Sequence, residues 1–234
     1  MFEKPFVVLP TYNEIANIER MVTALFAVGV KNLSILVVDD SSPDGTAEVV
    51  QQLQKKNSNL FLLIREKKEG LGRAYAAGFA KALELGGDAI IQMDADFSHD
   101  PLDIIRLLSA LDNADLVIGS RYCCGGKTVN WPWHRWCLSY GANIYARLVT
   151  RVSVADLTGG FKAWRADLMC ALDWKKIRGN GYGFQIEATF YAHKAGFHIQ
   201  EIPIIFSERR LGQSKMNRAI IVEALGLVWK LRQR

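Results

Sequence analysis

Short apolar runs alternate with amphipathic stretches along the first half of the chain. The apolar runs are rich in Val, Ile and Leu and predict strands, whereas the stretches between them have helical spacing. The predicted strands are Pro5–Leu9, Leu33–Val38, Leu60–Arg65, Asp88–Met93 and Asp115–Ile118, and the predicted helices cover residues 14–28, 44–56, 71–85 and 101–112. This alternation predicts an α/β fold with a Rossmann-like, mostly parallel sheet and helices on both faces.

The second half has a looser pattern. Loops are predicted over Cys123–Trp133 and over the charged segment Glu208–Lys215. The predicted helices are Arg135–Arg151, Phe184–Ala195 and Arg218–Arg232, and the predicted strands are Gly159–Trp164 and Ile199–Phe206. We expect one domain over residues 1–217, followed by an amphipathic C-terminal helix over residues 218–234, with no internal repeat and no flexible linker.

Polar residues gather directly after four of the predicted strands. They form the segments Pro10–Glu14, Asp39–Gly45, Asp94–Pro101 and Gly119–Tyr122. Because ligands bind beyond the carboxyl ends of parallel strands, these loops are expected to converge on one ligand-binding edge. Ordinary turn chemistry accounts for their Gly, Pro, Ser and Asn residues. It does not account for the carboxylates, which repel one another unless a cation is present.

The pair Asp94 and Asp96 follows the apolar strand that ends at Met93. Two acids two residues apart on an extended chain point to the same side, and each raises the pKa of the other unless a cation lies between them. A hard divalent cation, Mg²⁺ or Mn²⁺, suits such a pair, with water and substrate phosphates as further ligands. The alternative is glycoside hydrolysis, which needs two acids on opposite sides of a sugar and fits adjacent residues on one short loop less well.

Charge is distributed unevenly along the sequence. Residues 1–120 contain 11 Lys and Arg and 17 Asp and Glu, whereas residues 121–234 contain 18 and 7. The basic half is expected to meet anions such as phosphates or acidic lipid headgroups, with chance surface charge as the alternative. No nucleic-acid-binding motif occurs, so we expect no nucleic-acid partner.

The cysteines and the apolar segments bear on the location of the protein. Cys123, Cys124, Cys137 and Cys170 lack the spacing of a zinc site, and a strand is predicted almost directly after Met1, which favours a cytoplasmic protein with free thiols. No apolar run reaches the roughly 18 residues of a membrane span. Contact with a membrane surface is predicted for Trp131–Trp136 and is one of two alternatives, with core packing, for the C-terminal helix.

Several motifs together carry a family resemblance. The segments Leu9–Glu14, Val37–Thr46 and Asp94–Asp96 resemble those of family-2 glycosyltransferases with the GT-A fold. Within that family, the later segments are similar to those of the dolichol- or polyprenol-phosphate mannose synthases: Gly119–Tyr122, Thr158–Lys162, Gly181–Glu187 and Glu208–Lys215. The resemblance runs from about residue 6 to the end of the chain, and the later motifs are the more specific ones. It implies that residues 1–217 are the catalytic domain.

The resemblance also implies roles for individual residues. The donor nucleotide would contact Pro10, Tyr12, Glu14, Val38, Asp40, Asp94, Ala95, Arg209 and Lys215. The metal would be held by Asp94, Asp96 and Ser98, although the family often has Gln at the position of Ser98, so that a water is an alternative ligand. The acceptor phosphate would contact Arg121, Arg135 and Ser139. The residues implied in catalysis are Asp96, Arg121, Arg209 and Lys215.

The implied reaction is inverting transfer of mannose from GDP-mannose to a polyprenyl (dolichyl) monophosphate. An acceptor phosphate is largely ionised near neutral pH, so catalysis would depend on alignment and on neutralising the leaving diphosphate. His99 and His134 are alternative bases, and Glu187 is either a structural carboxylate or a donor contact.

Other readings of the sequence stay open. The first is a transferase that uses another nucleotide-sugar such as UDP-glucose, or a non-lipid acceptor, and the second is a non-catalytic nucleotide-sugar-binding subunit. A lipid acceptor implies peripheral binding to the cytoplasmic face of a membrane, either by the chain itself or through a small anchoring partner.

Overall fold

The computed structural model describes residues 2–208 and 226–232. The elements follow one another as β1 (Pro5–Thr11), α1 (Ile15–Ala27), β2 (Ser34–Asp39), α2 (Thr46–Gln54), β3 (Leu60–Ile64), α3 (Leu71–Glu84), β4 (Ala89–Gln92), α4 (Asp103–Leu111), β5 (Leu116–Ser120), β6 (Lys127–Val129), α5 (Trp133–Thr150), β7 (Lys162–Arg165), α6 (Ala166–Ala171), α7 (Tyr182–Lys194), β8 (Ile199–Pro203) and β9 (Ile205–Ser207). A further helical segment covers residues 226–231.

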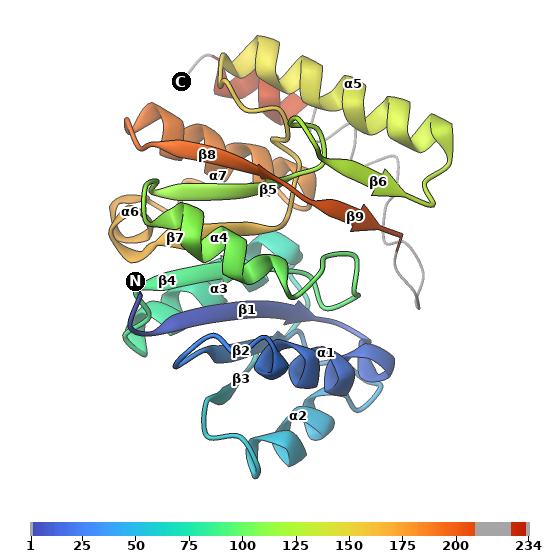
Figure 1. Cartoon of the computed structure of the whole chain (residues 1–234), viewed down its shortest axis with the longest axis vertical. Helices are drawn as coiled ribbons and strands as arrows, with labels where there is room; N and C mark the ends of the chain where they lie inside the picture. Colours follow the sequence, from blue (N-terminus) through green and yellow to red (C-terminus); the bar gives the residue numbers. More distant parts are fainter. Residues whose placement is uncertain (1, 209–225, 233–234) are drawn as a thin grey trace.

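A seven-stranded sheet forms the centre of the fold, with the strand order β3-β2-β1-β4-β7-β5-β8 (Figure 1). Each pairing is parallel except those of β7, which lies antiparallel between β4 and β5. Strands β6 and β9 form a second, two-stranded parallel sheet. The predicted mostly parallel sheet is therefore confirmed.

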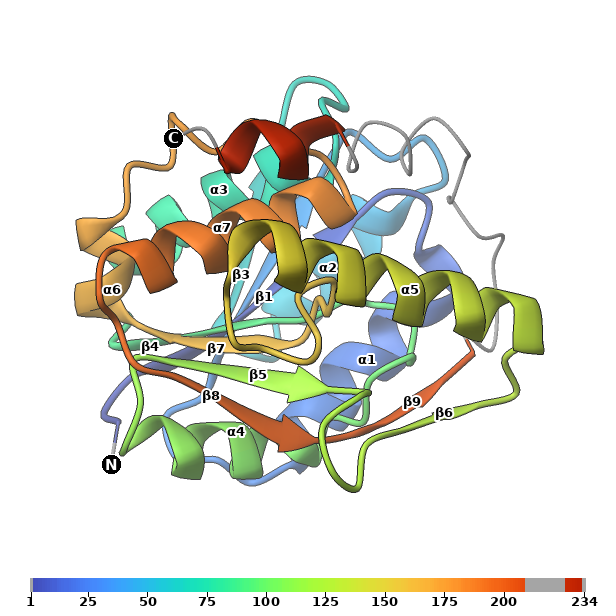
Figure 2. The ribbon, with the colours of Figure 1, turned by 90° about the horizontal axis from the view of Figure 1, so that it is seen from above.

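Helices cover both faces of the main sheet (Figure 2). Alternate side chains of a strand point to opposite faces. Val7 and Leu9 of β1 accordingly pack in the core with α1, α2 and α4, while Phe6 and Val8 pack in the core with α3, α5 and α7. Since both faces are buried, the central strands are continuous apolar runs, and this is why the sequence pattern located them well.

The predicted strands and helices of the first half are all present, with ends shifted by at most two residues. Two predictions for the second half are corrected. The predicted loop Cys123–Trp133 contains β6, and the single predicted strand Ile199–Phe206 is divided at Ile204. The division arises because the chain stops pairing with β5 of the main sheet at this point and begins to pair with β6. The backbone N–H of Ile204 donates to the carbonyl oxygen of Ser120 at 3.0 Å, and its carbonyl oxygen accepts the N–H of Lys127 at 3.0 Å.

The described part of the C-terminal segment packs on the core. Val228 and Leu231 are buried, and Leu227 lies against Gly183 at the start of α7. Of the two alternatives for this helix, core packing therefore holds for residues 226–231, and the rest of the predicted helix, residues 218–225 and 233–234, lies outside the described residues. Among the described helices, none combines the length and the apolar character that a membrane crossing requires. The four cysteines are free thiols, as expected.

Lys162 is a fully buried cation in the middle of the sheet, at the start of β7. Its Nζ donates to the carbonyl oxygen of Gln185 at 2.9 Å and to Oγ1 of Thr189 at 2.9 Å. Burial lowers the pKa of Lys162 to about 7, although the charge of Asp156 opposes the shift. The folded-state pKa is thus below the unfolded value, so between these values the unfolded chain binds a proton that the folded protein lacks.

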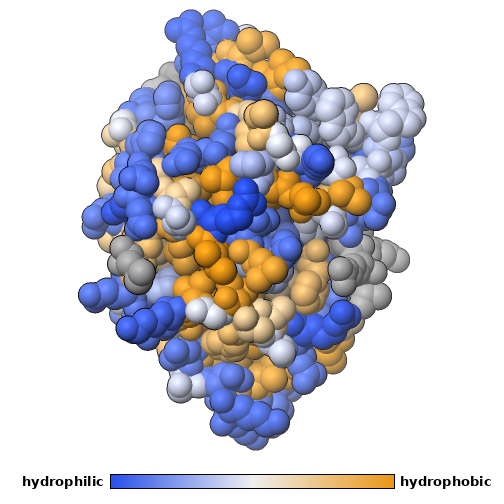
Figure 3. Space-filling model, viewed as in Figure 1, coloured by the Kyte–Doolittle hydropathy of each residue, from blue (hydrophilic) through white to orange (hydrophobic). Residues whose placement is uncertain are grey.

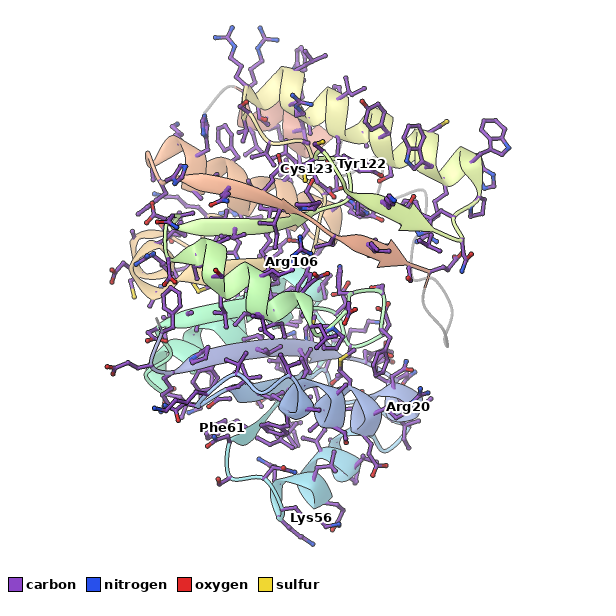
Figure 4. The ribbon with its side chains drawn as sticks, viewed as in Figure 1. Arg20, Lys56, Phe61, Arg106, Tyr122 and Cys123 are labelled. Carbon is purple, nitrogen blue, oxygen red and sulfur yellow. The ribbon has the colours of Figure 1, made fainter. Side chains whose placement is uncertain are left out.

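We predict from this shift that Lys162→Met changes how stability depends on pH. As the pH rises above 7, the unfolding free energy of the wild type should increase relative to that of the variant by about 1 kcal/mol per pH unit. Denaturant unfolding at several pH values between 7 and 9 measures the difference. Lys56→Met, at an exposed position (Figure 4), is the control for loss of a lysine. Parallel pH profiles for the wild type and Lys162→Met would contradict the prediction.

Candidate active site

The strand order creates a switch point at β1. Its neighbours are β2 and β4, and the helices α1 and α3 that follow β1 and β3 lie on opposite faces of the sheet. The loops after these strands therefore meet at the carboxyl edge, on the right of Figure 1. This is the position where open α/β sheets bind ligands. The predicted segments Pro10–Glu14, Asp39–Gly45 and Asp94–Pro101 lie there together.

The acidic turn, residues 94–98, follows β4. Asp94 is partly buried, and Asp96 is only 5% exposed. Oδ1 of Asp96 accepts the backbone N–H of Ser98 at 3.0 Å, which closes the turn. Within the described part of the chain, the buried hydroxyl of Ser98 has no hydrogen-bond partner. A buried hydroxyl without a partner is costly, so this oxygen is suited to a ligand that binds at the turn.

Three of the loops at this edge contain a residue with a strained backbone. Asn13, Ser41 and Phe97 have φ angles of 58°, 52° and 60°, in the left-handed region that residues other than glycine rarely adopt. The three residues belong to the loops after β1, β2 and β4. Phe97 is the bulkiest of them, and the guanidinium of Arg20 on α1 lies 5.6 Å from its ring. Such strain persists where surrounding contacts hold it and is typical of ligand sites.

Asp39 and Asp40 differ in role although they are adjacent. The carboxylate of Asp39 accepts the hydroxyls of Thr11 at 2.8 Å and Ser42 at 2.6 Å and therefore ties the two loops together. Asp40 instead pairs with Arg65, at 2.6 Å between Oδ1 and Nη1. Burial raises the pKa of Asp40, and Arg65 opposes that shift. Arg65 therefore balances the charge of Asp40, which is 5% exposed, and the nucleotide contact of Asp40 stays a prediction.

The other predicted donor residues are placed unequally. Tyr12 lies at the edge of the sheet with Nζ of Lys68 at 3.7 Å from its ring centre. The carboxylate of Glu14 accepts the side-chain amide of Asn17 at the start of α1. Pro10 is partly buried within β1. Ala95 is buried in the acidic turn.

Val38 differs from these residues. Its side chain is fully buried in the core, on the sheet face that α3 covers. Its predicted nucleotide contact stays a prediction that side-chain burial does not favour.

Arg121, at the end of β5, is held by a buried ion pair. Its Nε and Nη2 donate to the two oxygens of Asp156, both at 2.7 Å, and Nη2 also donates to Oγ1 of Thr158 at 2.7 Å. Glu201 of β8 supports this arrangement because its carboxylate accepts the backbone N–H of Asp156 at 3.0 Å. Burial opposes both charges, yet the mutual attraction raises the pKa of Arg121 and lowers that of Asp156. The direction of the guanidinium is therefore fixed.

Arg135 lies on the first turn of α5 and shares an aromatic neighbour with Arg121. The centre of the Trp131 ring is 4.2 Å from Cζ of Arg135 and 5.5 Å from Cζ of Arg121. Nη1 of Arg135 donates to Glu208 at 2.7 Å. Ser139 is one helical turn further along α5 and partly buried. The structure thus brings together the three residues expected at the acceptor phosphate.

Phe206 of β9 joins the acceptor side to the acidic turn. Its ring lies 5.4 Å from Cζ of Arg121 and 5.2 Å from the His99 ring. The adjacent Ser207 donates its backbone N–H to the carbonyl oxygen of Ser98 at 3.1 Å. The acidic turn and the two arginines therefore border the same aromatic cluster, as the sequence prediction required.

His99 is an unsuitable base in this setting. Its ring stacks on Phe161 at 4.8 Å between ring centres, and burial lowers its pKa to about 4. Glu187, the other residue left open, accepts the backbone N–H groups of Arg178 and Gly179 at 2.8 and 2.9 Å, which is a structural role.

Some predicted residues are not placed, and others were missed. Arg209 and Lys215 lie outside the described residues. Asp156 was missed, although it is the single acid among residues 121–165 beside seven basic residues, and this isolation is a signal that sequence reasoning had available. Arg65, Lys68 and Tyr75 have no such signal, because their partners are remote in sequence.

Comparisons with known proteins agree with this arrangement. Residues 6–171 match the family model described as "Glycosyl transferase family 2". The chain is 44% identical over 229 residues to the undecaprenyl-phosphate mannosyltransferase of Micrococcus luteus, covering 97% of this chain and 94% of that protein. It is 42% identical over 236 residues to the polyprenol monophosphomannose synthase of Mycolicibacterium smegmatis, covering 99% and 89%.

Solved structures share the fold at lower sequence identity. Glucosyl-3-phosphoglycerate synthase from Mycobacterium tuberculosis, in complex with Mn²⁺, UDP and glucosyl-3-phosphoglycerate, superposes with a TM-score of 0.73 and 20% identity, covering 99% of this chain and 80% of that one. The same synthase with Mn²⁺ and UDP-glucose gives a TM-score of 0.71 at 20% identity, covering 99% and 79%. The GT-A fold expected from the sequence is thereby confirmed.

The Arg121–Asp156 pair leads to a stability prediction. Asp156→Ala leaves a buried guanidinium without its partner, so we expect a loss of about 3–5 kcal/mol in the free energy of unfolding. Glu208→Ala breaks the more exposed pair with Arg135 and should cost less than about 1 kcal/mol. Denaturant unfolding of both variants measures the contrast, and equal small losses would refute a structural role for the buried pair.

Proposed function

The chain belongs to glycosyl transferase family 2, and we propose that it is an inverting mannosyltransferase that moves mannose from GDP-mannose to a polyprenyl monophosphate. The product would be polyprenyl-phosphate-mannose. The names of the two relatives at 42–44% identity over nearly the whole chain support the acceptor and the sugar. The observation that carries the proposal is that Arg121, Arg135 and the acidic turn border one aromatic cluster. The Phe206 ring lies against Arg121, His99 and Trp131, and the Trp131 ring lies against both arginines.

The donor half of the site has the chemistry that a nucleoside diphosphate requires. Tyr12 offers an aromatic ring, and Asp40 offers a carboxylate acceptor beside the two cations Arg65 and Lys68. A base and ribose placed here would direct the diphosphate toward Asp94 and Asp96. Arg209 and Lys215 are proposed to contact the diphosphate as well, and they lie outside the described residues.

The acidic turn fits Mg²⁺ or Mn²⁺. The carboxylates of Asp94 and Asp96 and the partnerless hydroxyl of Ser98 are hard oxygen donors. No group of three or more His, Cys, Asp or Glu side chains suited to a metal occurs within residues 2–208 and 226–232. A cation bound by one or two carboxylates, which takes its other ligands from water and a diphosphate, agrees with this sparse set. When bound, it would neutralise charge on the leaving diphosphate.

The residues on the acceptor side would position the attacking group. An oxygen of the acceptor phosphate forms a bond to the anomeric carbon, and the bond from that carbon to the nucleoside diphosphate breaks with inversion. The attacking oxygen is already ionised near neutral pH, so no base is needed, in agreement with the low pKa of His99. Arg121 and Arg135 would hold the phosphate and offset its repulsion from the diphosphate. Ser139 would add a hydrogen bond.

Helix α5 provides a surface for the membrane that contains such a lipid. Large side chains recur at helical spacing on its outer side, and the most exposed are Trp133 at 77% and Leu148 at 74%. The rings of Trp136 and Tyr140 stack on each other, with 4.9 Å between the ring centres. Aromatic residues near basic ones favour the headgroup region of a bilayer. Because Arg135 and Ser139 are on the same helix, this surface would present the lipid phosphate to the site.

A panel of labelled nucleotide-sugars tests the reaction. Purified protein is incubated with Mg²⁺ or Mn²⁺, with either GDP-mannose or UDP-glucose, and with either polyprenyl phosphate or a water-soluble acceptor such as phosphoglyceric acid. We expect lipid-extractable label from GDP-mannose alone. Lipid label from UDP-glucose would identify a different donor, label on a water-soluble acceptor would identify a non-lipid acceptor, and nucleotide binding without any product would indicate a non-catalytic subunit.

Loss of the acidic turn should stop turnover. We expect Asp96→Asn to lower kcat by about a hundredfold or more, because the variant loses a carboxylate that would hold the cation, and the cation would neutralise charge on the leaving diphosphate. Asp100→Asn is the matched control, since Asp100 is exposed and accepts the backbone N–H of Leu102 near the start of α4. Near-normal turnover in Asp96→Asn, measured with saturating donor and metal, would remove the metal from the proposal.

The membrane surface is tested by vesicle binding. We expect Trp133→Ser combined with Trp136→Ser to weaken binding to anionic vesicles about tenfold, because exposed indoles no longer enter the headgroup region. Leu102→Ser combined with Ile105→Ser is the control. These residues are 61% and 49% exposed on α4. Hydrophobic side chains gather near the centre of the face shown in Figure 3, where Figure 1 draws α4. Equal binding by the two double variants in co-sedimentation would contradict a specific role for α5 and favour an anchoring partner.

A further inference from the structure

Asp94, the first acid of the acidic turn, is hydrogen-bonded to a tyrosine of α3. The hydroxyl of Tyr75, on α3, donates to Oδ1 of Asp94 at 2.9 Å. Tyr75 is fully buried, so no donor substrate can touch it without a rearrangement of the core. A phenol hydroxyl is the donor and a carboxylate is the acceptor, so the bond directs one particular oxygen of Asp94 toward α3.

The Tyr75 ring is packed against two other aromatic rings. It stacks on Phe79 at 5.6 Å between ring centres and on Phe184 of α7 at 5.9 Å, with interplanar angles of 25° and 7°. Phe79 is itself enclosed by Trp164 and Trp174 at 6.4 and 5.1 Å. Close-packed rings leave a side chain few alternative rotamers. The position of the hydroxyl is therefore set by the core and not by the loops of the site.

The second oxygen of Asp94 lies near Gly160 and the side chain of Gln185. A Cβ atom at Gly160 would lie 3.7 Å from Oδ2 of Asp94 and 3.5 Å from Nε2 of Gln185, which is ordinary van der Waals contact. Oε1 of Gln185 accepts Nε2 of Gln92 at 2.7 Å, and the carbonyl oxygen of Gln185 accepts Nζ of Lys162 at 2.9 Å. The wall beside Oδ2 is thus anchored to β4 and β7.

We propose that Tyr75 is a positioning residue that sets the rotation of the Asp94 carboxylate for binding of the nucleoside diphosphate with its cation. This inference rests on the proposed function. A carboxylate that lacks a fixed partner rotates about its last bond and presents its oxygens in varying directions. With Oδ1 bonded to Tyr75, Asp94 keeps Oδ2 on the side of Gly160. Oδ2 is then the oxygen available to the donor or its cation. Preorganised groups bind with a smaller ordering cost.

The variant Tyr75→Phe tests this role because it removes the hydroxyl and keeps the stacked ring. We expect GDP binding in the presence of Mn²⁺ to weaken about tenfold by calorimetry, since a hydrogen bond to a charged group is lost. The KM for the donor should rise by a similar factor. The KM for polyprenyl phosphate should stay unchanged, because Arg121 and Arg135 are untouched. A purely structural role would not separate the two KM values.

Two controls keep the test specific. Tyr191→Phe removes a tyrosine hydroxyl near the other end of α7 and should leave GDP–Mn²⁺ binding unchanged. Phe79→Leu loosens the stack but keeps the Tyr75 hydroxyl. Compared with Tyr75→Phe, it should lower the melting temperature more and weaken GDP–Mn²⁺ binding less. Wild-type binding of GDP–Mn²⁺ by Tyr75→Phe would overturn the inference, and so would an equal rise in both KM values.

The failure of the inference differs from the failure of the proposed function. If wild-type protein binds GDP–Mn²⁺ and Tyr75→Phe binds it equally well, only the role of Tyr75 is overturned. If the wild type binds UDP–Mn²⁺ instead, the comparison is made with UDP, and the donor assignment alone is wrong. If the wild type binds neither nucleotide, the proposed function and the inference both fail.

Discussion

The site depends on one electrostatic constraint, which is that carboxylates collect at the carboxyl edge of a buried sheet. Asp39 and Asp40 lie at the end of β2, Asp94 and Asp96 follow β4 on the other side of β1, and each is at least partly removed from water. Charges in such a setting must be paired, hydrogen-bonded or balanced by a cation. Three of these acids have hydrogen-bond or ion-pair partners within the protein. Asp39 is satisfied by Thr11 and Ser42, Asp40 by Arg65, and one oxygen of Asp94 by Tyr75.

Asp96, the fourth of these acids, lies near the positively charged residues of the acceptor side. Asp96 accepts the backbone N–H of Ser98, and this hydrogen bond closes the turn in which Phe97 has a φ of 60°. On the other side of His99 and Phe206, Arg121 and Arg135 provide positive charge that faces the same region. A cation and a diphosphate would complete the neutralisation from the donor side, and a lipid phosphate would do so from the acceptor side. The proposed transfer therefore follows from how the two halves of the site balance charge.

The sequence predicted the features that depend on local pattern. Strands buried on both faces and amphipathic helices were located to within two residues in the first half, because their periodicity is strong. The acidic turn and the basic second half were also visible, since they are matters of composition. The antiparallel insertion of β7 and the bend at Ile204 were not, because pairing partners are remote in sequence. Tyr75 could not be predicted for the same reason, because its hydroxyl bonds to an acid 19 residues away. The burial of Val38 on the face covered by α3 was also not predicted.

Anomalous diffraction from crystals grown with GDP and Mn²⁺ is the sharpest test of the proposed metal site. Data collected at the manganese absorption edge locate the metal independently of any activity. We expect a manganese peak within bonding distance of the Asp96 carboxylate, with the diphosphate of GDP bound to the same ion. A nucleotide bound at the sheet edge with manganese absent from the acidic turn, or a peak held by other residues, would rule out a cation at Asp96.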